Sequence, residues 1–246
     1  MSELLAVIFS HPIRIEIINQ LYIKSYSLTN LSKIIGSISN SEISRHLSIL
    51  IEQCIVMKDK LKGKEYTLTT FGKTLKNLSN PLEFISLHKD FFSEHSLEDL
   101  PIDLQRSIDK LGESNFLPNT GMVMMEMDRI TKEAEKSIWI MVNATFPFSG
   151  ENSLEKKFLV PKKIASSQRI PQDLLKSSKT LKIRSLPSIS IAIGISDDNK
   201  EGMILFPKKN DSEPDYSCGF VVNDRIGIEY LIQIWEYYWN QGSIIH

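Results

Sequence analysis

The sequence predicts an α+β protein of two domains, in which a helical domain ending in a β-hairpin precedes an α/β domain. Residues 1–80 show apolar patterns at helical spacing followed by two short β-prone runs. From about Leu117 the pattern changes to strands that alternate with helices. The 246 residues are enough for two modest hydrophobic cores.

Four helices are expected before the hairpin, and the first three lie within residues 2–36. Residues 2–9 and 11–24 have helical patterns, and Pro12 stands in the first turn of the second, where its missing N–H costs nothing. Thr29 is expected to cap a third helix that Gly36 ends. The buried face of the second helix should comprise Ile13, Ile17, Ile18 and Leu21.

A further helix is predicted to begin at Ser39, because Ser39 and Glu42 have the spacing of a capping box. We call it the recognition helix. Its apolar stripe at helical spacing comprises Ile43, Leu47, Leu50 and Ile51. Its other faces carry short polar side chains and one guanidinium, namely Ser41, Ser44, Arg45 and Ser48, with His46 at the edge.

This polar face suits the major groove of double-stranded DNA. A guanidinium can bind a guanine edge through two hydrogen bonds, and a serine can bond to a base or a phosphate. An amphipathic helix with an ordinary solvated face would show the same pattern, so the helix alone does not separate the two interpretations.

The hairpin that follows favours DNA binding. Residues 55–59 and 65–69 are β-prone, and a glycine turn rich in lysine joins them. A basic hairpin directly after a capped helix is the order of a winged helix-turn-helix, in which the wing contacts phosphates. The wing lysines are Lys58, Lys60, Lys62 and Lys64.

Charge is divided unevenly along the chain. Residues 1–80 hold ten Lys and Arg against six Asp and Glu, whereas the remainder holds nineteen against twenty-four. The positive excess therefore coincides with the recognition helix and wing. No apolar run approaches a membrane span, and the N-terminus lacks the positive charges of a signal peptide, so a cytoplasmic protein is expected. Cys54 and Cys218 form no metal-site or disulfide pattern, and no cofactor is expected.

The runs HPIRIEIINQL, LTNLSKIIGSISNSEISRHLSILIEQCIV and GKEYTLTTFGKTL resemble the ArsR-type winged-helix repressor domain over about residues 8–78. The resemblance implies that the chain binds DNA as a homodimer. The metal-sensing members carry a C-x-C pair on the recognition helix, and this helix has none, so thiol-based metal sensing is not expected.

Residues 81–114 are predicted as a helical linker or dimerisation segment between domains 1–80 and 115–246. Its first helix, residues 81–92, has more apolar positions than one face of a surface helix needs, which suggests a dimer contact or a domain seam. His88 and His95 lie seven residues apart near Asp90 and Glu94, a set that could bind zinc. Two polar residues beside a packed helix explain the pattern as well, and no metal site is assigned.

The last domain is predicted to be an α/β sensor-like layer. A helix at 121–136 precedes the apolar strand 137–146, which suits a central position covered on both faces. A final helix is expected at 226–239. Between them lie strands at 156–160, 182–185, 190–195, 202–206 and 217–222, and a helix at 172–177.

This domain resembles, over residues 88–242, the middle domain of the archaeal methanogenesis regulators of the Fil type and of archaeal regulators that join it to an ArsR-like domain. The resemblance rests on HKDFFSEHSLEDLP, EKSIWIMVNATFP, ISIAIGISDDNKEGMILFP and PDYSCGFVVND, followed by a terminal helix ending in WEYYW.

No motif for nucleotide binding, for a nucleophile elbow or for a zinc deaminase is present, so an enzyme is not expected. Ligands of α/β layers bind beyond the carboxyl ends of strands, which predicts an effector pocket there. The candidate residues are Asn143, Thr145, Phe146, Asp197, Tyr216 and Ser217.

The sequence thus predicts a homodimeric transcription regulator that binds double-stranded DNA and responds to a small-molecule effector or a signalling protein. Two alternatives stay open: a winged-helix module that binds proteins, and a metalloregulator that uses His88 and His95.

Overall fold

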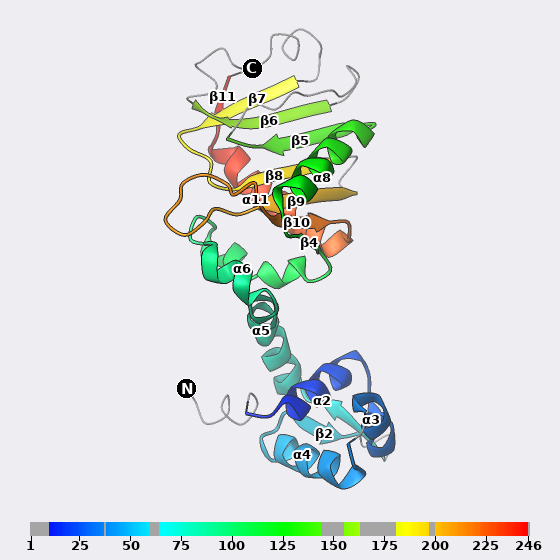
Figure 1. Cartoon of the computed structure of the whole chain (residues 1–246). Coiled ribbons are helices and arrows are strands. Elements are labelled where there is room, and N and C mark those ends of the chain that lie inside the picture. Colours follow the sequence, from blue (N-terminus) through cyan, green and yellow to red (C-terminus); the bar gives the residue numbers. More distant parts are fainter. Residues whose placement is uncertain are drawn as a thin grey trace. The chain divides into compact units, whose positions relative to one another are not determined.

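The computed structural model describes residues 10–36, 38–59, 64–143, 155–162, 181–196 and 200–245. They form an α+β chain of two compact units, Met1–Asn80 and Pro81–His246 (Figure 1). The predicted helices 2–9 and 172–177 lie outside the described residues. None of the helices described has the length and apolar character that crossing a bilayer requires.

The described part of the first unit contains the three predicted helices that follow residue 10, and the hairpin. Pro12 stands at the start of α2, and Gly36 ends α3 with a φ of 74°. Ser27, not Thr29, caps α3: its hydroxyl accepts a hydrogen bond from the Asn30 amide (3.3 Å). The elements are α2 (Pro12–Ile23), β1 (Tyr26–Ser27), α3 (Leu28–Ile35), α4 (Asn40–Glu52), β2 (Val56–Lys58) and β3 (Glu65–Leu68).

The core of this unit lies between the three helices and the hairpin. The predicted α2 positions Ile17, Ile18 and Leu21 are buried, and Ile13 packs beside them. Gly72 stands where the next helix meets the base of the hairpin. A Cβ there would lie 2.2 Å from the Ile55 carbonyl oxygen, so only glycine permits this close approach.

Helix α5 (Thr70–Leu87) is longer than predicted. The sequence placed a helix start at Pro81, but α5 begins at Thr70 and contains Pro81. Leu82 and Leu87 are exposed, whereas Phe84 is buried in the second unit. After α5 come α6 (Lys89–Glu94), α7 (Ile102–Gln105) and a 3-10 turn, η1 (Ile108–Leu111). Residues 81–114 contribute Phe84, Phe91, Leu100, Ile108 and Leu111 to the main core of the second unit.

The second unit is built on an eight-stranded mixed sheet with the strand order β11-β7-β6-β5-β8-β9-β10-β4. The pairs β5–β6 and β6–β7 are parallel, and the others are antiparallel. The edge strands β4 and β11 were not predicted. The strands are β4 (Asn115–Leu117), β5 (Ser137–Met141), β6 (Glu155–Pro161), β7 (Leu181–Leu186), β8 (Ala192–Ser196), β9 (Glu201–Leu205), β10 (Gly219–Val222) and β11 (Ser243–Ile244).

Helices cover both faces of this sheet, as predicted for β5. Helix α8 (Thr120–Glu133) lies across one face and α11 (Arg225–Gln241) lies on the other (Figure 1). Successive side chains of a strand point to opposite faces of the sheet. In β10, Phe220 and Val222 join the core under α11, and Val221 joins the core under α8.

Three tryptophans stack at one side of the second unit. The ring centroids of Trp139 and Trp235 are 4.8 Å apart, and those of Trp235 and Trp239 are 4.5 Å apart. Cations cover the two ends, with Lys157 Nζ 3.8 Å from the Trp139 centroid and the Arg184 guanidinium 4.7 Å from that of Trp239. Such contacts are favourable because the ring faces are negative.

Candidate nucleic-acid interface

The recognition helix α4 begins as its sequence predicts. Ser39 is the N-cap, and its hydroxyl accepts a hydrogen bond from the Glu42 amide (3.2 Å). The reciprocal bond, which the Ser39 amide would donate to the Glu42 carboxylate, is not found among the described residues. One half of the capping box therefore fixes the first turn.

The buried face of α4 is turned slightly from the predicted one. Ile43, Leu47 and Leu50 are at most 1% exposed, but Ile51 is 36% exposed. The reason is the fourth buried position, which His46 takes instead of Ile51. The buried arc therefore extends around the helix from His46 at one edge to Leu47 at the other, and Ile51 lies beyond Leu47 at the margin.

The predicted DNA-contacting residues lie on the outward face. Ser41, Arg45 and Ser48 are exposed, and Ser44 is half-buried beside them. The Ser48 hydroxyl donates to the Ser44 carbonyl (3.0 Å), and the Ser41 and Ser39 hydroxyls share a hydrogen bond (2.9 Å). These four residues span a continuous arc of about 100° around the helix, given about 3.6 residues per turn.

His46 was predicted to approach DNA, and this is wrong: its side chain is fully buried. Its Nδ1 accepts a hydrogen bond from Arg14 Nε (3.4 Å), and its ring lies 4.3 Å from the His11 ring. Burial lowers the pKa of His46, and the nearby His11, Arg14 and Arg45 lower it further, against a smaller opposite effect of Glu42. His46 is thus a neutral core residue.

This burial predicts that the first unit loses stability in mild acid. Because the folded pKa of His46 is lowered, the unfolded chain takes up its proton first as the pH falls below 6.5. One such group changes the unfolding free energy by at most about 1.4 kcal/mol per pH unit. We expect amide hydrogen exchange across residues 43–50 to accelerate between about pH 6.5 and 5, once corrected for intrinsic rates. His46→Gln should reduce this dependence, and an unchanged dependence would assign it to another group.

The wing has the predicted antiparallel pairing. Lys58 of β2 lies opposite Tyr66 of β3, and its Nζ is 5.9 Å from that ring centroid. Lys58 and Lys64 are exposed, one at each side of the turn, while Lys60 and Lys62 lie outside the described residues. The short strand β1, which was not predicted, pairs with β3 and makes the hairpin a three-stranded sheet.

The three predicted effector residues that the structure describes, Asn143, Tyr216 and Ser217, do not form one pocket. The Tyr216 hydroxyl donates to Asn143 Oδ1 (2.8 Å), so the Asn143 amide has a partner within the fold. Tyr216 packs against the core under α8, and burial raises its pKa to about 12. Ser217 instead bonds to Asp215, beside Cys218 of the opposite core. The predicted residues Thr145, Phe146 and Asp197 lie outside the described part of the chain.

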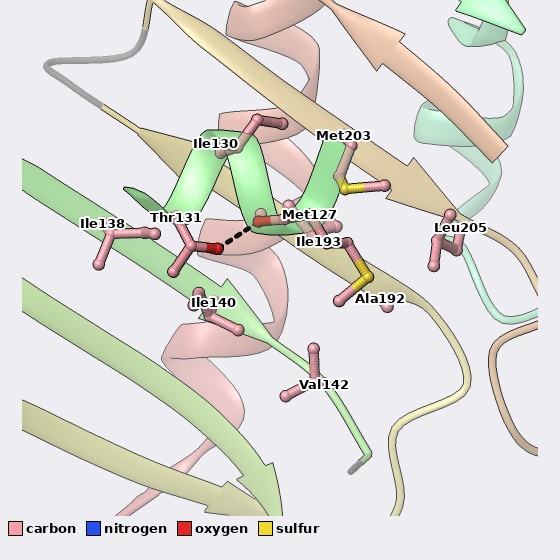
Figure 2. A pocket seen from close by; sticks show the side chains of 11 residues that line it. Met127, Ile130, Thr131, Ile138, Ile140, Val142, Ala192, Ile193, Met203 and Leu205 are labelled. Atoms are coloured by element: carbon pink, nitrogen blue, oxygen red, sulfur yellow. Dashed lines mark hydrogen bonds between the residues drawn. The ribbon is translucent and has the colours of Figure 1, made fainter. Parts of the chain in front are cut away.

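A cavity does lie between α8 and strands β5, β8 and β9, but it is small and apolar (Figure 2). Its volume is about 40 Å³, far below that of a site for a small organic ligand, about 300 Å³ or more. Its one side-chain hydroxyl, on Thr131, already donates to the Met127 carbonyl. The cavity is lined by Met127, Ile130, Thr131, Ile138, Ile140, Val142, Ala192, Ile193, Gly194, Met203 and Leu205.

His88 and His95, the alternative zinc pair, have separate surroundings. The His88 ring lies among those of Phe84, Phe116 and Phe220, and burial lowers its pKa. His95 Nε2 lies 3.0 Å from Asp215 Oδ2, with Cys218 Sγ 3.4 Å away. The sequence reasoning missed Asp215 and Cys218 as a pair, although their D-x-x-C spacing was a local signal.

Comparison with known proteins identifies no family, since no family model and no curated protein matches. Among solved structures, the chain is similar to TrmBL2, an archaeal chromatin protein whose structure shows a novel mode of DNA binding. The identity is 12%, the TM-score is 0.42, and the match covers 93% of this chain and 92% of that one. It is also similar to NucT from Helicobacter pylori, with 10% identity, a TM-score of 0.41, and 54% and 99% of the two chains covered. Both TM-scores lie below 0.5, so the functional assignment rests on the residues of this chain.

Proposed function

We propose that the chain is a sequence-specific regulator of transcription that binds double-stranded DNA as a homodimer and has no catalytic role. The observation that carries this proposal is the outward face of α4. Exposed Ser41, Arg45 and Ser48 are followed directly by a hairpin with exposed Lys58 and Lys64. The resemblance to ArsR-type domains, which the sequence alone suggested, leads to the same function.

The two parts have different tasks in this proposal. In the major groove, Arg45 can donate two parallel hydrogen bonds to a guanine edge, and Ser41 and Ser48 can bond to a base or a phosphate. The ammonium groups of the wing contact phosphates, which adds affinity without sequence preference. The excess of positive charge in residues 1–80 supports this arrangement.

Salt dependence tests the proposal against the alternative of a protein-interaction module. We expect the full chain to bind a labelled duplex of its own upstream sequence, measured by anisotropy, with an affinity that falls steeply between two salt concentrations. Changing Lys60, Lys62 and Lys64 to Ala should weaken binding to every duplex and reduce the salt slope by up to about 3 per protomer. The matched control changes Lys89, Lys182 and Lys200, exposed lysines of the second unit. Absence of binding, or binding indifferent to salt, would favour a protein partner.

The dimer contact is proposed on exposed apolar side chains of the first unit. Phe71 and Leu78 lie seven residues apart on one face of α5, and they are 44% and 70% exposed. Ile23, at the end of α2, is 71% exposed. The neighbouring Tyr22 hydroxyl donates to Asn77 Oδ1 (2.6 Å), which places the end of α2 beside α5.

Leu78→Glu is expected to weaken the dimer about tenfold or more, because it introduces a charge into the apolar contact. Sedimentation velocity over a dilution series measures the dissociation constant. Lys73→Glu is the control: it adds the same side chain to an exposed position on the opposite face of α5. A dimer that withstands Leu78→Glu would place the contact elsewhere.

We further propose that the second unit modulates DNA binding in response to a small molecule or a protein. An effector changes occupancy of DNA only if it prefers one arrangement of the dimer. Those of its predicted residues that the structure describes do not converge on a pocket, so the Asn143–Tyr216 pair is better explained as part of the fold.

A further inference from the structure

Three side chains that could ligate a metal meet in the second unit. His95, the C-cap residue of α6, forms an isolated β-bridge with Lys208. Two backbone hydrogen bonds frame it, from the Ser96 amide to the Pro207 carbonyl (3.0 Å) and from the Lys209 amide to the Glu94 carbonyl (2.8 Å). Asp215 and Cys218 come from the segment that leads into β10. One donor atom from each of the three lies within 4.8 Å of the others.

The position of the His95 ring determines which nitrogen faces the other two residues. Nδ1 lies 2.9 Å from the Phe91 carbonyl oxygen, which can only accept, so Nδ1 carries a proton. The ring stacks on Phe91 with centroids 4.0 Å apart, and the residue is only 5% exposed. A metal-binding histidine usually donates its other N–H to a carbonyl or carboxylate in this way.

The other ring nitrogen, Nε2, faces a carboxylate, 3.0 Å from Asp215 Oδ2. Either a proton or a metal ion can bridge two atoms at this distance. A proton would join this one pair. A metal ion would also use the third atom, Cys218 Sγ, which lies 3.4 Å from Nε2 and 3.8 Å from Oδ2.

These separations match a tetrahedral zinc site. Zinc binds nitrogen and oxygen at about 2.0–2.2 Å and thiolate sulfur at about 2.3 Å, which places N and O ligands about 3.3 Å apart and S and N or O ligands about 3.6 Å apart. The three observed distances lie within about 0.3 Å of these values.

We propose that His95 Nε2, Asp215 Oδ2 and Cys218 Sγ bind a Zn²⁺ ion and leave its fourth position for water or an external ligand. The carboxylate and the thiolate balance the charge of the ion. The Ser217 hydroxyl donates to Asp215 Oδ2 (2.7 Å) and orients it as an outer partner. Lys208 Nζ, 3.5 Å from Oδ2, belongs to a half-exposed side chain that can turn towards solvent.

The first unit offers a contrasting cluster of His11, Glu42 and His46. There His46 Nδ1 already accepts a hydrogen bond from Arg14, and the positive charges of Arg14 and Arg45 act on the ring. These charges oppose a cation, so we assign no metal to that cluster. The zinc site is also distinct from the predicted pair, because His88 does not take part in it.

Cobalt titration tests the proposal, because Co²⁺ replaces Zn²⁺ in such sites and absorbs strongly when a thiolate binds it. The full chain, freed of metal with a chelator, is titrated with Co²⁺. We expect saturation at one equivalent, a thiolate-to-cobalt band in the near ultraviolet, and loss of that band on addition of Zn²⁺. A wild-type chain without a thiolate band at saturation would overturn the proposal.

The thiolate band can be assigned to one residue, because the chain contains only two cysteines, Cys54 and Cys218. Cys54→Ser, at an exposed position, should keep the band, which must then arise from Cys218; loss of the band in this variant would overturn the site. Asp215→Asn should weaken Co²⁺ binding by at least about 100-fold, the upper range seen for loss of an outer partner. His46→Gln, which disables the other cluster, should leave binding unchanged, and a marked loss would transfer the metal to the first unit.

Discussion

Arg45→Ala should lower the preference of the chain for its own upstream DNA over an unrelated duplex by about 5- to 150-fold. A bidentate contact to a guanine contributes about 1–3 kcal/mol of discrimination, and tenfold corresponds to about 1.4 kcal/mol. Arg45 is the one guanidinium on the outward face of α4, so no neighbour on that face can replace it. The ratio of the two dissociation constants, measured by anisotropy at one fixed salt concentration, gives the effect.

Two controls define what Arg45 does. Arg45→Lys keeps the charge but loses the planar fork, so it should restore affinity for unrelated DNA without restoring the preference. Arg225→Ala removes an exposed arginine of the second unit and should change neither value. If Arg45→Ala weakened binding equally on both duplexes, Arg45 would be a phosphate contact, and the reading of bases would have to come from elsewhere.

Leu47→Ala should destabilise the first unit by about 2–5 kcal/mol, as expected for a large-to-small change at a fully buried position. Ile51→Ala, four residues further along the same helix, should cost less than about 1 kcal/mol, because Ile51 is already 36% exposed. Hydrogen exchange across α4, or urea unfolding followed by circular dichroism, measures the difference. Equal losses in the two variants would contradict an orientation of α4 that buries Leu47 and leaves Ile51 at the margin.

The N-terminal elements could be predicted because their signals are local. The capping serine before α4, the apolar spacing within it and the glycine turn of the wing each lie within a few residues. The burial of His46 could not be predicted in the same way. It depends on Arg14 and His11, which lie more than thirty residues away and supply the partners that make an imidazole acceptable inside a core.

The error in the predicted start of helix α5 has a similar origin. Pro81 looked like a helix start because proline favours that position, yet α5 continues through it, with the loss of one backbone hydrogen bond. Its two ends are held by packing, Gly72 against the Ile55 carbonyl and Phe84 in the core of the second unit. Tertiary contacts of this kind outweigh local preference and leave no short-range pattern.

The second unit shows why a functional site is harder to predict from sequence than a strand. Its six inner strands, β5 to β10, were predicted from their apolar runs, but the assumption that strand ends converge on a pocket did not hold for Tyr216 and Ser217. They lie in the turn before β10, where Tyr216 packs against the core under α8 and Ser217 bonds instead to Asp215. The meeting of His95 with Asp215, 120 residues later, depends on the isolated β-bridges from His95 to Lys208 and from Pro207 to Pro214, which the sequence pattern does not determine.

The tryptophan stack gives the chain an internal optical reporter. All three tryptophans, Trp139, Trp235 and Trp239, belong to the second unit. The first unit contains tyrosines but no tryptophan. Intrinsic emission excited at the red edge therefore originates in one unit alone. If DNA occupied α4 and the units acted independently, that emission would stay constant. Any change in its intensity or wavelength when unlabelled DNA is added would measure communication between the two units, without an attached dye.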